Sequence, residues 1–452
     1  MNGIKKFSNL EILLLIMATL FGGLMLFIPV QYLFAGLICI IALVYLLLNP
    51  KVSFYIAIAT STWVYGLSLN NQVPFNHTDI LITICFISTF LRFMFVDKFK
   101  VNIRTKLDYW LIPLLILYFF AGMTSLSHRG YQGFLRFGEA LAIFYMTVYF
   151  IRTKTITISK LIKFILFVAI FQAIIGYLQS ITGGLGADFR DNRGYLGYLG
   201  LGSSSVWHGM GTMYHFNNLG AFLSSIFLFF IPIYHFIVKN KRKGKIILFI
   251  LMAGIITTYS RNALICITSG TLFFYYYKTQ NKVKFSVILG LISTFIIVAY
   301  NFLKNTSYIA TLSPRNDVWD YCWDVITSSP HNFLLGTGLK SFEEAISTYM
   351  SNSFVYIHAH NLYLSMFLET GIIGLSLILA FLVANIIYAY KNINVKHKFL
   401  KVLNFSIFLY LISIPLLGFF DDTFESFYTQ IWLYLVLGIL YAKYTPKEKR
   451  LM

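Results

Sequence analysis

The chain has 452 residues, of which 58% are hydrophobic and only 12% are charged. About 25% of the residues in a soluble domain are charged, so this composition excludes an ordinary soluble enzyme. The formal net charge of +19 does not indicate a nucleic-acid partner, because the basic residues lie in loops between apolar runs. We therefore expect an integral membrane protein.

The apolar runs predict membrane helices. Many reach the roughly 17–25 residues that a bilayer-spanning helix needs, and none has the alternation of a membrane strand. The first run follows Lys5 and Lys6 without a cleavage site, which predicts an uncleaved span. The fold class is thus an all-α, polytopic membrane bundle of about 12–14 transmembrane helices, formed as a single domain over residues 1–452. The candidate spans are 10–28, 31–48, 52–69, 79–96, 109–126, 134–151, 163–181, 213–238, 246–259, 262–277, 285–303, 361–389, 402–420 and 428–443.

The loops alternate in charge if the N-terminus lies in the cytoplasm. Lysine clusters at 239–245 and 391–401 then fall inside, as the positive-inside rule expects. The outer side receives mainly arginines, with two lysines: Arg129, Arg136, Arg190, Arg193, Arg261, Arg315, Lys304 and Lys340. Residues 246–277 carry a basic cluster at each end, which predicts two short spans that turn at the outer surface beside Arg261.

Two predicted outer loops are long. The first, residues 182–212, is rich in glycine and carries Arg190 and Arg193, which indicates a flexible, non-helical loop. The second, residues 304–360, contains two amphipathic segments, 315–328 and 340–349. Helical spacing places Val318, Cys322 and Val325 on one side of the first segment, so we expect a helical cap over the bundle.

Arginine is the cation suited to an outer phosphate site. Its planar group binds phosphate oxygens in a bidentate way and keeps its charge when it is desolvated. Several outward arginines beside aromatic residues therefore suit a lipid-linked pyrophosphate. The alternative is that these arginines cap helix ends or pair with aspartates such as Asp188 and Asp317.

His358 and His360 stand two residues apart, directly before a long apolar run. A His-x-His pair binds a metal only with a further ligand in a suitable position, and the nearby sequence offers none, so we predict no metal and no cofactor. A histidine is a competent general base near neutral pH. Periodicity alone favours a plainer role, an interfacial histidine that is hydrogen-bonded to a carbonyl.

Two acidic features remain, one carboxylate within a span and one acidic turn. Glu369 lies within a predicted span, where a carboxylate is a functional candidate, either in catalysis or as a brace for an arginine. Asp421, Asp422 and Glu425 form an acidic turn between the last two spans. This turn could bind a sugar or an ion, but a solvated loop is the simpler interpretation.

Four blocks resemble the O-antigen ligase/polymerase superfamily of bacterial surface-polysaccharide enzymes, in that family's order. They are Gly211-Thr212 with Asn217-Asn218; Ser260-Arg261; Arg315 with Trp319, Pro330, Gly336 and Gly338; and His360-Asn361 with Glu369, Gly371 and Gly374. The chain departs from the pattern where Arg190 and Arg193 stand well upstream of the first block, so either of the two can be the matching arginine.

The resemblance implies transfer of a glycan from undecaprenyl pyrophosphate to an acceptor hydroxyl, on the periplasmic or extracellular side of a bacterial cytoplasmic (inner) membrane. Flippase and chain-length regulator proteins are the partners that it implies. His360 would remove the acceptor proton in a metal-independent, inverting displacement, and Glu369 would orient His360 or an arginine. Arginines would stabilise the pyrophosphate, and further residues would bind substrate: Arg261, Arg315, one of Arg190 and Arg193, Asn218, Trp319 and Asn361.

Three functions remain open at this stage. A polymerase would transfer the glycan to another lipid-linked repeat unit, and a ligase would transfer it to lipid A-core. The two long arginine-bearing loops favour the polymerase. A transporter or flippase for the same lipid-linked sugar is a different class, but it would show related halves and charges near the middle of the membrane.

Overall fold

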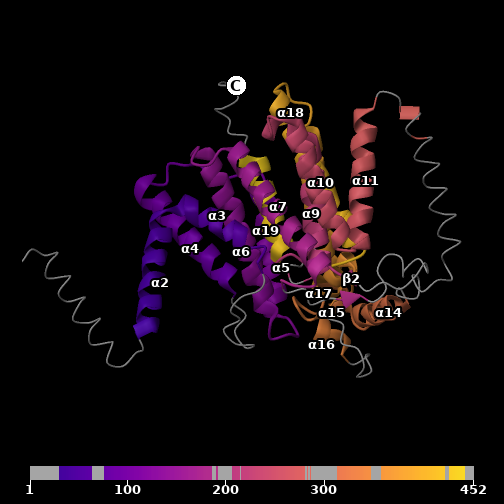
Figure 1. The fold of residues 1–452 in the computed structure, drawn as a ribbon. Coiled ribbons are helices and arrows are strands. Elements are labelled where there is room, and N and C mark those ends of the chain that lie inside the picture. Colours follow the sequence, from indigo (N-terminus) through magenta and orange to yellow (C-terminus); the bar gives the residue numbers. More distant parts are fainter. Residues whose placement is uncertain are drawn as a thin grey trace, which may run out of the picture.

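The computed structural model describes residues 30–63, 76–185, 190–191, 206–213, 215–279, 282–283, 286, 313–347, 358–422 and 427–442. Outside these residues lie Arg193, the predicted span 10–28 and, apart from residue 286, the predicted span 285–303. Figure 1 shows a bundle of helices. The helical elements are α2 (Val30–Leu48), α3 (Pro50–Thr60), α4 (His77–Leu91), η1 (Arg92–Val96), α5 (Asp108–Met123), α6 (Gly130–Arg152), α7 (Ile158–Thr182), α9 (Phe216–Ile237), α10 (Lys241–Thr257), α11 (Arg261–Lys278), α14 (Ser313–Thr327), α15 (Pro330–Leu335), α16 (Phe342–Ile346), α17 (Leu362–Lys391), α18 (Lys398–Gly418) and α19 (Phe427–Ala442).

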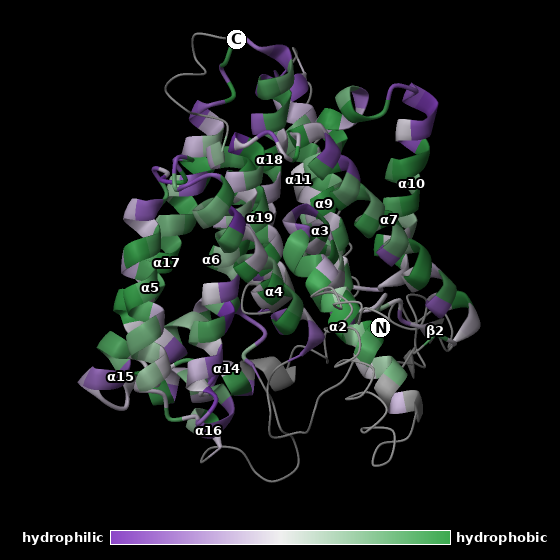
Figure 2. Ribbon diagram, turned by 90° about the vertical axis from the view of Figure 1, so that its left-hand side faces the viewer, coloured by the Kyte–Doolittle hydropathy of each residue, from purple (hydrophilic) through white to green (hydrophobic). Residues whose placement is uncertain are grey.

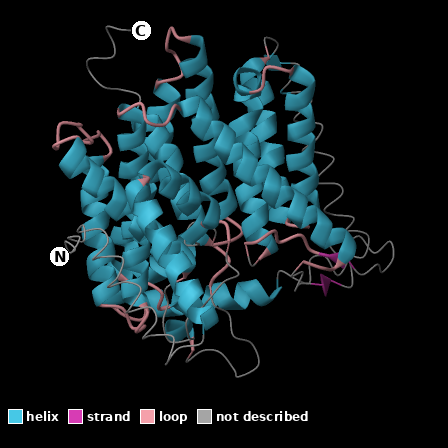
Figure 3. Cartoon of the chain, turned by 60° about the vertical axis from the view of Figure 1, so that its left-hand side comes forward, coloured by secondary structure: helices cyan, strands magenta, loops and turns pink. Residues whose placement is uncertain are grey.

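The predicted fold class, a polytopic helical membrane bundle, is confirmed. Six helical segments of the described chain are long and apolar enough to cross a membrane, or seven if one bent pair is counted as a span. This number is below the predicted twelve to fourteen. Two predicted spans lie outside the described residues, and several others form shorter helices, such as α5 and α10. The strands β1 (Arg190–Asp191) and β2 (Val206–Trp207) add one small antiparallel pair (Figure 3).

The predicted span 52–69 is described only as far as Trp63, and over those residues it does not form an independent crossing. Its helix, α3, has 11 residues and ends at Thr60. It folds back from α2 through 112° across Asn49, so the pair is a broken span or a re-entrant segment. Pro50 explains the break, because proline suits the first position of a helix but cannot continue the helix before it.

The core lies between α6, α7, α9, α10, α18 and α19. Helix α19 packs along α6, and α9 packs against α10, α11 and α18. Trp432 and Tyr434 of α19 are buried, whereas large apolar residues on the outside are exposed, with Tyr109 at 83% and Phe249 at 73%. Figure 2 shows hydrophobic colouring along the helices and hydrophilic residues gathered towards their ends. This is the arrangement expected for a bundle surrounded by lipid.

The two ends of the bundle differ. We call one the cap end: it carries α14, α15 and α16 and the first residues of α9, α11 and α17 (Figure 1). We call the other the lysine end: it carries the turns at 238–240 and 392–397, which join α9 to α10 and α17 to α18. The predicted hairpin at 246–277 is present, because α10 and α11 turn at Thr258–Ser260, although α10 begins at Lys241, five residues before the predicted span.

The predicted amphipathic cap helix is also confirmed. Helix α14 buries Val318, Cys322 and Val325, while its three aspartates, Asp317, Asp320 and Asp324, are exposed. Its apolar side packs with α16 and α17 in a second core beside the main one. The other predicted amphipathic segment, 340–349, forms only the short helix α16.

Residues 208–212, the end of the predicted loop 182–212, are non-helical as expected, but together with Met213 they form a buried segment, 208–213, that is held by hydrogen bonds. This segment is buried, with His208 at 2% and Met213 at 0% exposure. Two glutamines of α7 bind its backbone: Gln179 Oε1 accepts from the amides of Met210 and Gly211, both at 2.8 Å, and Gln172 Oε1 accepts from the amide of Thr212 at 2.9 Å. Glycine permits this close approach to the helix, but local sequence alone does not show which helix supplies the partners.

Candidate active site

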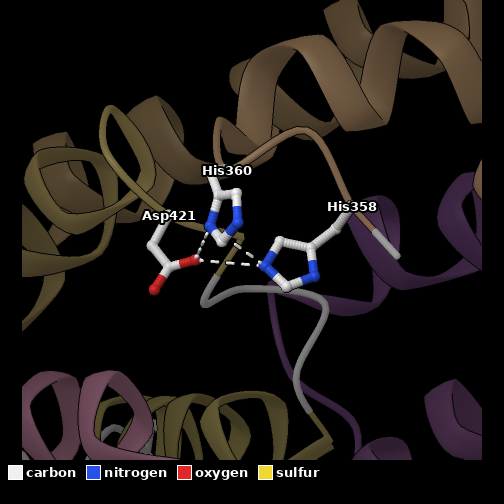
Figure 4. A group of neighbouring side chains, drawn as sticks. All are labelled: His358, His360 and Asp421. Carbon is white, nitrogen blue, oxygen red and sulfur yellow. Dashed lines mark hydrogen bonds and ion pairs between the residues drawn. The ribbon is translucent and has the colours of Figure 1, made fainter. Parts of the chain in front are cut away.

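Two histidines and one carboxylate meet at the cap end. His360 Nδ1 lies 3.3 Å from Asp421 Oδ1, and His358 Nε2 lies 3.5 Å from the same oxygen. The two ring nitrogens are 3.2 Å apart. Figure 4 shows both rings directed at the Asp421 carboxylate. Within the described residues, this is the group of three His, Cys, Asp or Glu side chains whose geometry could hold a metal ion.

Helix termini place these side chains. Asn361 caps α17, since its Oδ1 accepts from the amides of Tyr363 at 3.0 Å and Leu364 at 3.1 Å. Tyr363 then donates its hydroxyl to the carbonyl of Pro415 in α18, at 2.8 Å. The start of α17 is thereby fastened to the end of α18, so His360, one residue before the cap, meets Asp421, three residues after Gly418.

The His358–His360 segment is held in an uncommon backbone conformation. His360 has φ of 52°, a left-handed value that few residues other than glycine adopt. Trp319 of α14 supports the segment from the side, because its Nε1 donates to the carbonyl of Ala359 at 2.9 Å. Strained backbone of this kind occurs where surrounding contacts over-determine it, often at functional sites.

Asp421 is buried, which corrects the interpretation of its turn as a solvated loop. It is 6% exposed, and its neighbour Asp422 is 9% exposed. The Asp422 amide donates to Asp421 Oδ1 at 2.9 Å. Burial on its own would raise the pKa of Asp421, but the hydrogen bonds and charges of His358 and His360 outweigh burial and lower the pKa below its ordinary value. Asp421 is therefore a carboxylate at neutral pH.

His215 adds a third imidazole to this region. It is the N-cap of α9, and its Nδ1 accepts from the amide of Asn217 at 3.2 Å. Burial lowers the pKa of His215 to about 4; Asp421 opposes this shift, and the other nearby histidines reinforce it. His215 is therefore neutral near pH 7, and it adds a polar ring without adding charge.

The Ser260-Arg261-Asn262 turn joins the same end of the bundle. Ser260 donates to Asn217 Oδ1 at 2.9 Å, and Asn262 Nδ2 donates to the carbonyl of Leu417, four residues before Asp421, at 2.8 Å. Arg261 stands between them as the first residue of α11. The first and second family blocks thus meet at the N-terminus of α11, where the helix dipole also favours an anion. The end of α18, which leads to Asp421, contacts the same turn.

For two further predicted arginines, Arg315 and Arg190, the structure describes the backbone but not the side chain. Arg315 lies in the first turn of α14, but its side chain lies outside the described part of the chain. Arg190 pairs its backbone with Trp207 in the small strand pair, again without a described side chain. The choice between Arg190 and Arg193 therefore stays open.

Three predicted substrate-binding residues have identified contacts within the protein. Trp319 and Asn361 support the histidine segment, as described above. Asn218 Nδ2 lies 3.4 Å from the carbonyl of Met213, and Asn218 also lines a small cavity with Ser225 and Trp432. These contacts position neighbouring backbone and side chains, and their roles towards a substrate remain predictions.

Glu369 lies deeper in the bundle. It is 2% exposed, roughly 12 Å along α17 from the Asn361 cap. Its backbone carbonyl accepts from the amide of Gly338 at 2.9 Å. Gly371 has φ of 63°, and a Cβ there would lie 2.3 Å from the backbone of Leu334. The third and fourth family blocks therefore dock onto each other here, and the role of Glu369 towards His360 or an arginine stays a prediction.

Sequence reasoning underrated Asp421. The acidic turn was visible, but its solvated interpretation hid the third member of the histidine pair, because 61 residues separate His360 from Asp421. The available signal was an aspartate directly after an apolar span that ends at the same side of the membrane as the His-x-His pair.

Comparison with known proteins bears on residues 246–379. This segment, which runs from α10 into α17, matches the family model described as O-antigen ligase. The match confirms the resemblance to the O-antigen ligase/polymerase superfamily, whose members are membrane enzymes of the glycosyltransferase type that act on lipid-linked glycans. It covers Arg261, Arg315, His360 and Glu369, and it ends before Asp421. No curated protein matches the chain.

Proposed function

We propose that the protein is a polysaccharide polymerase. It transfers a glycan from undecaprenyl pyrophosphate to a hydroxyl of another lipid-linked repeat unit, at the outer face of the bacterial cytoplasmic membrane. The observation that carries this proposal is the contact between His360 and Asp421 at the cap end, beside the turn that begins with Ser260 and Arg261. The lysines at the opposite end support an outward-facing site.

His360 acts as the general base. With Nδ1–H donated to Asp421, the lone pair of Nε2 is available to the acceptor hydroxyl. Removal of that proton makes the oxygen a stronger nucleophile as it attacks the anomeric carbon. The positive charge that forms on the ring is stabilised by the buried Asp421 carboxylate, which is ionised at neutral pH for the reasons given above.

Arg261 acts on the leaving group. As the bond from the sugar to the pyrophosphate breaks, negative charge grows on the phosphate oxygens. A guanidinium at the start of α11, together with the amides of that helix terminus, stabilises this charge without a metal ion. Arg315 and one of Arg190 and Arg193 complete the pyrophosphate site in this proposal.

Chain extension in cells tests the proposal. Cells that lack the native protein are complemented with wild type, His360→Ala or Arg261→Ala, and the surface glycan is resolved on a gel. We expect each variant to lose the long chains although its membrane level stays normal, since each removes a group that contributes about 10²-fold or more to the rate. Normal chain lengths in either variant would contradict the assigned roles.

The product separates the alternatives. A polymerase gives a ladder of chain lengths when it complements a polymerase-deficient strain, whereas a ligase restores attachment to lipid A-core in a ligase-deficient strain. Turnover by purified protein in detergent, where no gradient exists, excludes transport as the whole function.

A further inference from the structure

The three polar atoms of the histidine–aspartate group cannot all be joined by hydrogen bonds. His358 Nε2, His360 Nδ1 and Asp421 Oδ1 form a triangle with sides of 3.2, 3.3 and 3.5 Å. If both nitrogens donate to Oδ1, neither can accept from the other, so two donors lie only 3.2 Å apart. Two ring nitrogens and a carboxylate oxygen gathered this closely are instead a group that could hold a metal ion.

The dimensions of the triangle fit a small transition metal. In a tetrahedral site with zinc–nitrogen distances of 2.0–2.1 Å, neighbouring ligand atoms lie about 3.3 Å apart. Octahedral coordination at the same distances would bring neighbours to about 2.9 Å. The observed sides average close to the tetrahedral value without any movement of the protein.

We propose that His358 Nε2, His360 Nδ1 and Asp421 Oδ1 form a binding site for Zn²⁺ or a similar divalent transition metal. The ligand set, two imidazoles and one carboxylate, matches the chemistry of open zinc sites that keep a fourth position for water or substrate. The side chains of His358 and His360 are 30% and 23% exposed, so the metal can enter from the cap end.

The surroundings of the triangle support a built site. The Asp422 amide donates to Asp421 Oδ1 and so orients the carboxylate, and the bond from Trp319 to the Ala359 carbonyl fixes the segment between the two histidines. Supporting contacts of this kind orient metal ligands in known sites. The third ligand that the sequence argument could not find is Asp421.

Metal binding would switch off the proposed reaction. A neutral imidazole that coordinates through Nδ1 keeps its proton on Nε2, so Nε2 of His360 can no longer accept a proton from the acceptor hydroxyl. Zn²⁺ would thus compete with the catalytic tautomer. This inhibition rests on the proposed function, whereas the binding itself does not.

Metal binding is tested directly with Co²⁺, which gives intense visible absorption when it is tetrahedral. Purified protein in detergent is treated with chelator, dialysed and titrated with Co²⁺. We expect one equivalent to bind with a tetrahedral spectrum and to be displaced by Zn²⁺. His358→Ala should bind at least about 10-fold more weakly, while the exposed-histidine control His331→Ala should bind like wild type. A six-coordinate spectrum, or equal binding by wild type and His358→Ala, would overturn the site.

Transfer measured in parallel separates the two proposals. Zn²⁺ should reduce wild-type transfer, a chelator should restore it, and His358→Ala should resist Zn²⁺ when compared with its own metal-free rate. If Co²⁺ binds as expected but Zn²⁺ leaves transfer unchanged, the site stands and the role of His360 as base fails.

Discussion

Two carboxylates in this bundle pair with basic side chains in different ways. Asp79 of α4 accepts from Arg136 of α6 at 2.7 Å and closes the cap of its own helix through the amide of Asn76 at 2.8 Å. Asp421 instead faces two imidazoles at 3.3 and 3.5 Å. Both carboxylates are largely buried, with side chains 4% and 9% exposed.

The difference lies in the partner. An arginine is always charged, so the Asp79–Arg136 pair is a fixed connection between two helices. An imidazole gains and loses a proton near neutral pH, and its lone pair can bind a metal. A buried carboxylate therefore serves structure at Asp79 and reactivity at Asp421. Variants at Asp79–Arg136 should change stability, and variants at Asp421 should change transfer.

The largest expected effect is on stability, at the arginine pair. Arg136→Met would leave Asp79 without its partner, close to Glu139, whose Oε2 is buried without a hydrogen bond. Removing one member of a buried pair costs about 3–5 kcal/mol. Thermal unfolding in detergent should show a clear fall in Tm, with transfer per folded molecule retained. The exposed Arg129→Met is the control, and an unchanged Tm in Arg136→Met would remove the structural role.

The opposite pattern is expected at the histidine group. Asp421→Asn keeps the shape of the side chain but cannot stabilise a charged His360, so transfer should fall about 100-fold while Tm stays close to wild type. Initial rates with purified protein measure the transfer, and thermal unfolding measures Tm. Asp324→Asn, on the exposed side of α14, should match wild type in both. Full transfer by Asp421→Asn would show that His360 works without this carboxylate.

His215 should make the fold sensitive to acid. Its pKa is about 4 when folded and about 6.5 when unfolded, so the unfolded chain binds the extra proton between these values. Stability is therefore complete above about pH 6.5 and falls as the pH drops, by about 2 kcal/mol at pH 5. His215→Asn keeps a good N-cap, and its Tm should fall less between pH 7 and pH 5. The neighbours His208, His358, His360 and Asp421 are present in both proteins, so an identical fall in the two would assign the acid loss to these other groups.

The smallest expected effect concerns the tryptophans of α14. Trp319→Phe removes the bond to the Ala359 carbonyl, which should cost about 1 kcal/mol and lower transfer several-fold, because the His358–His360 segment loses a support. Trp323→Phe is the matched control, since Trp323 is 52% exposed. Transfer rates and Tm of both variants decide the matter, and equal behaviour of the two would leave Trp319 without a positioning role.

Much of the fold could be predicted because its signals are local. The spacing of Val318, Cys322 and Val325 predicted the amphipathic helix, and the basic clusters around 246–277 predicted the hairpin that begins α11 at Arg261. The broken pair α2 and α3 was missed. Hydropathy measures how apolar a run is, and it does not report the direction of the chain on either side of Pro50.

Only part of the site could be predicted, because some of its contacts join residues that are far apart in the sequence. His360 was identified from its own sequence block, but its carboxylate partner comes from a turn 61 residues later. The buried segment 208–213 was missed because Gln172 and Gln179, which hold it, lie in another helix. Glycine in a sequence shows that the backbone can approach closely, and the approaching partner is set by the packing of the bundle.

A structure of the protein with undecaprenyl pyrophosphate bound, determined by electron cryo-microscopy in lipid nanodiscs, tests the central claim most directly. We expect the pyrophosphate at the cap end, with the Arg261 guanidinium within hydrogen-bond distance of its oxygens and the sugar-binding side open towards His360. A pyrophosphate bound at the lysine end, or at the cap end but away from Arg261 and His360, would contradict the account.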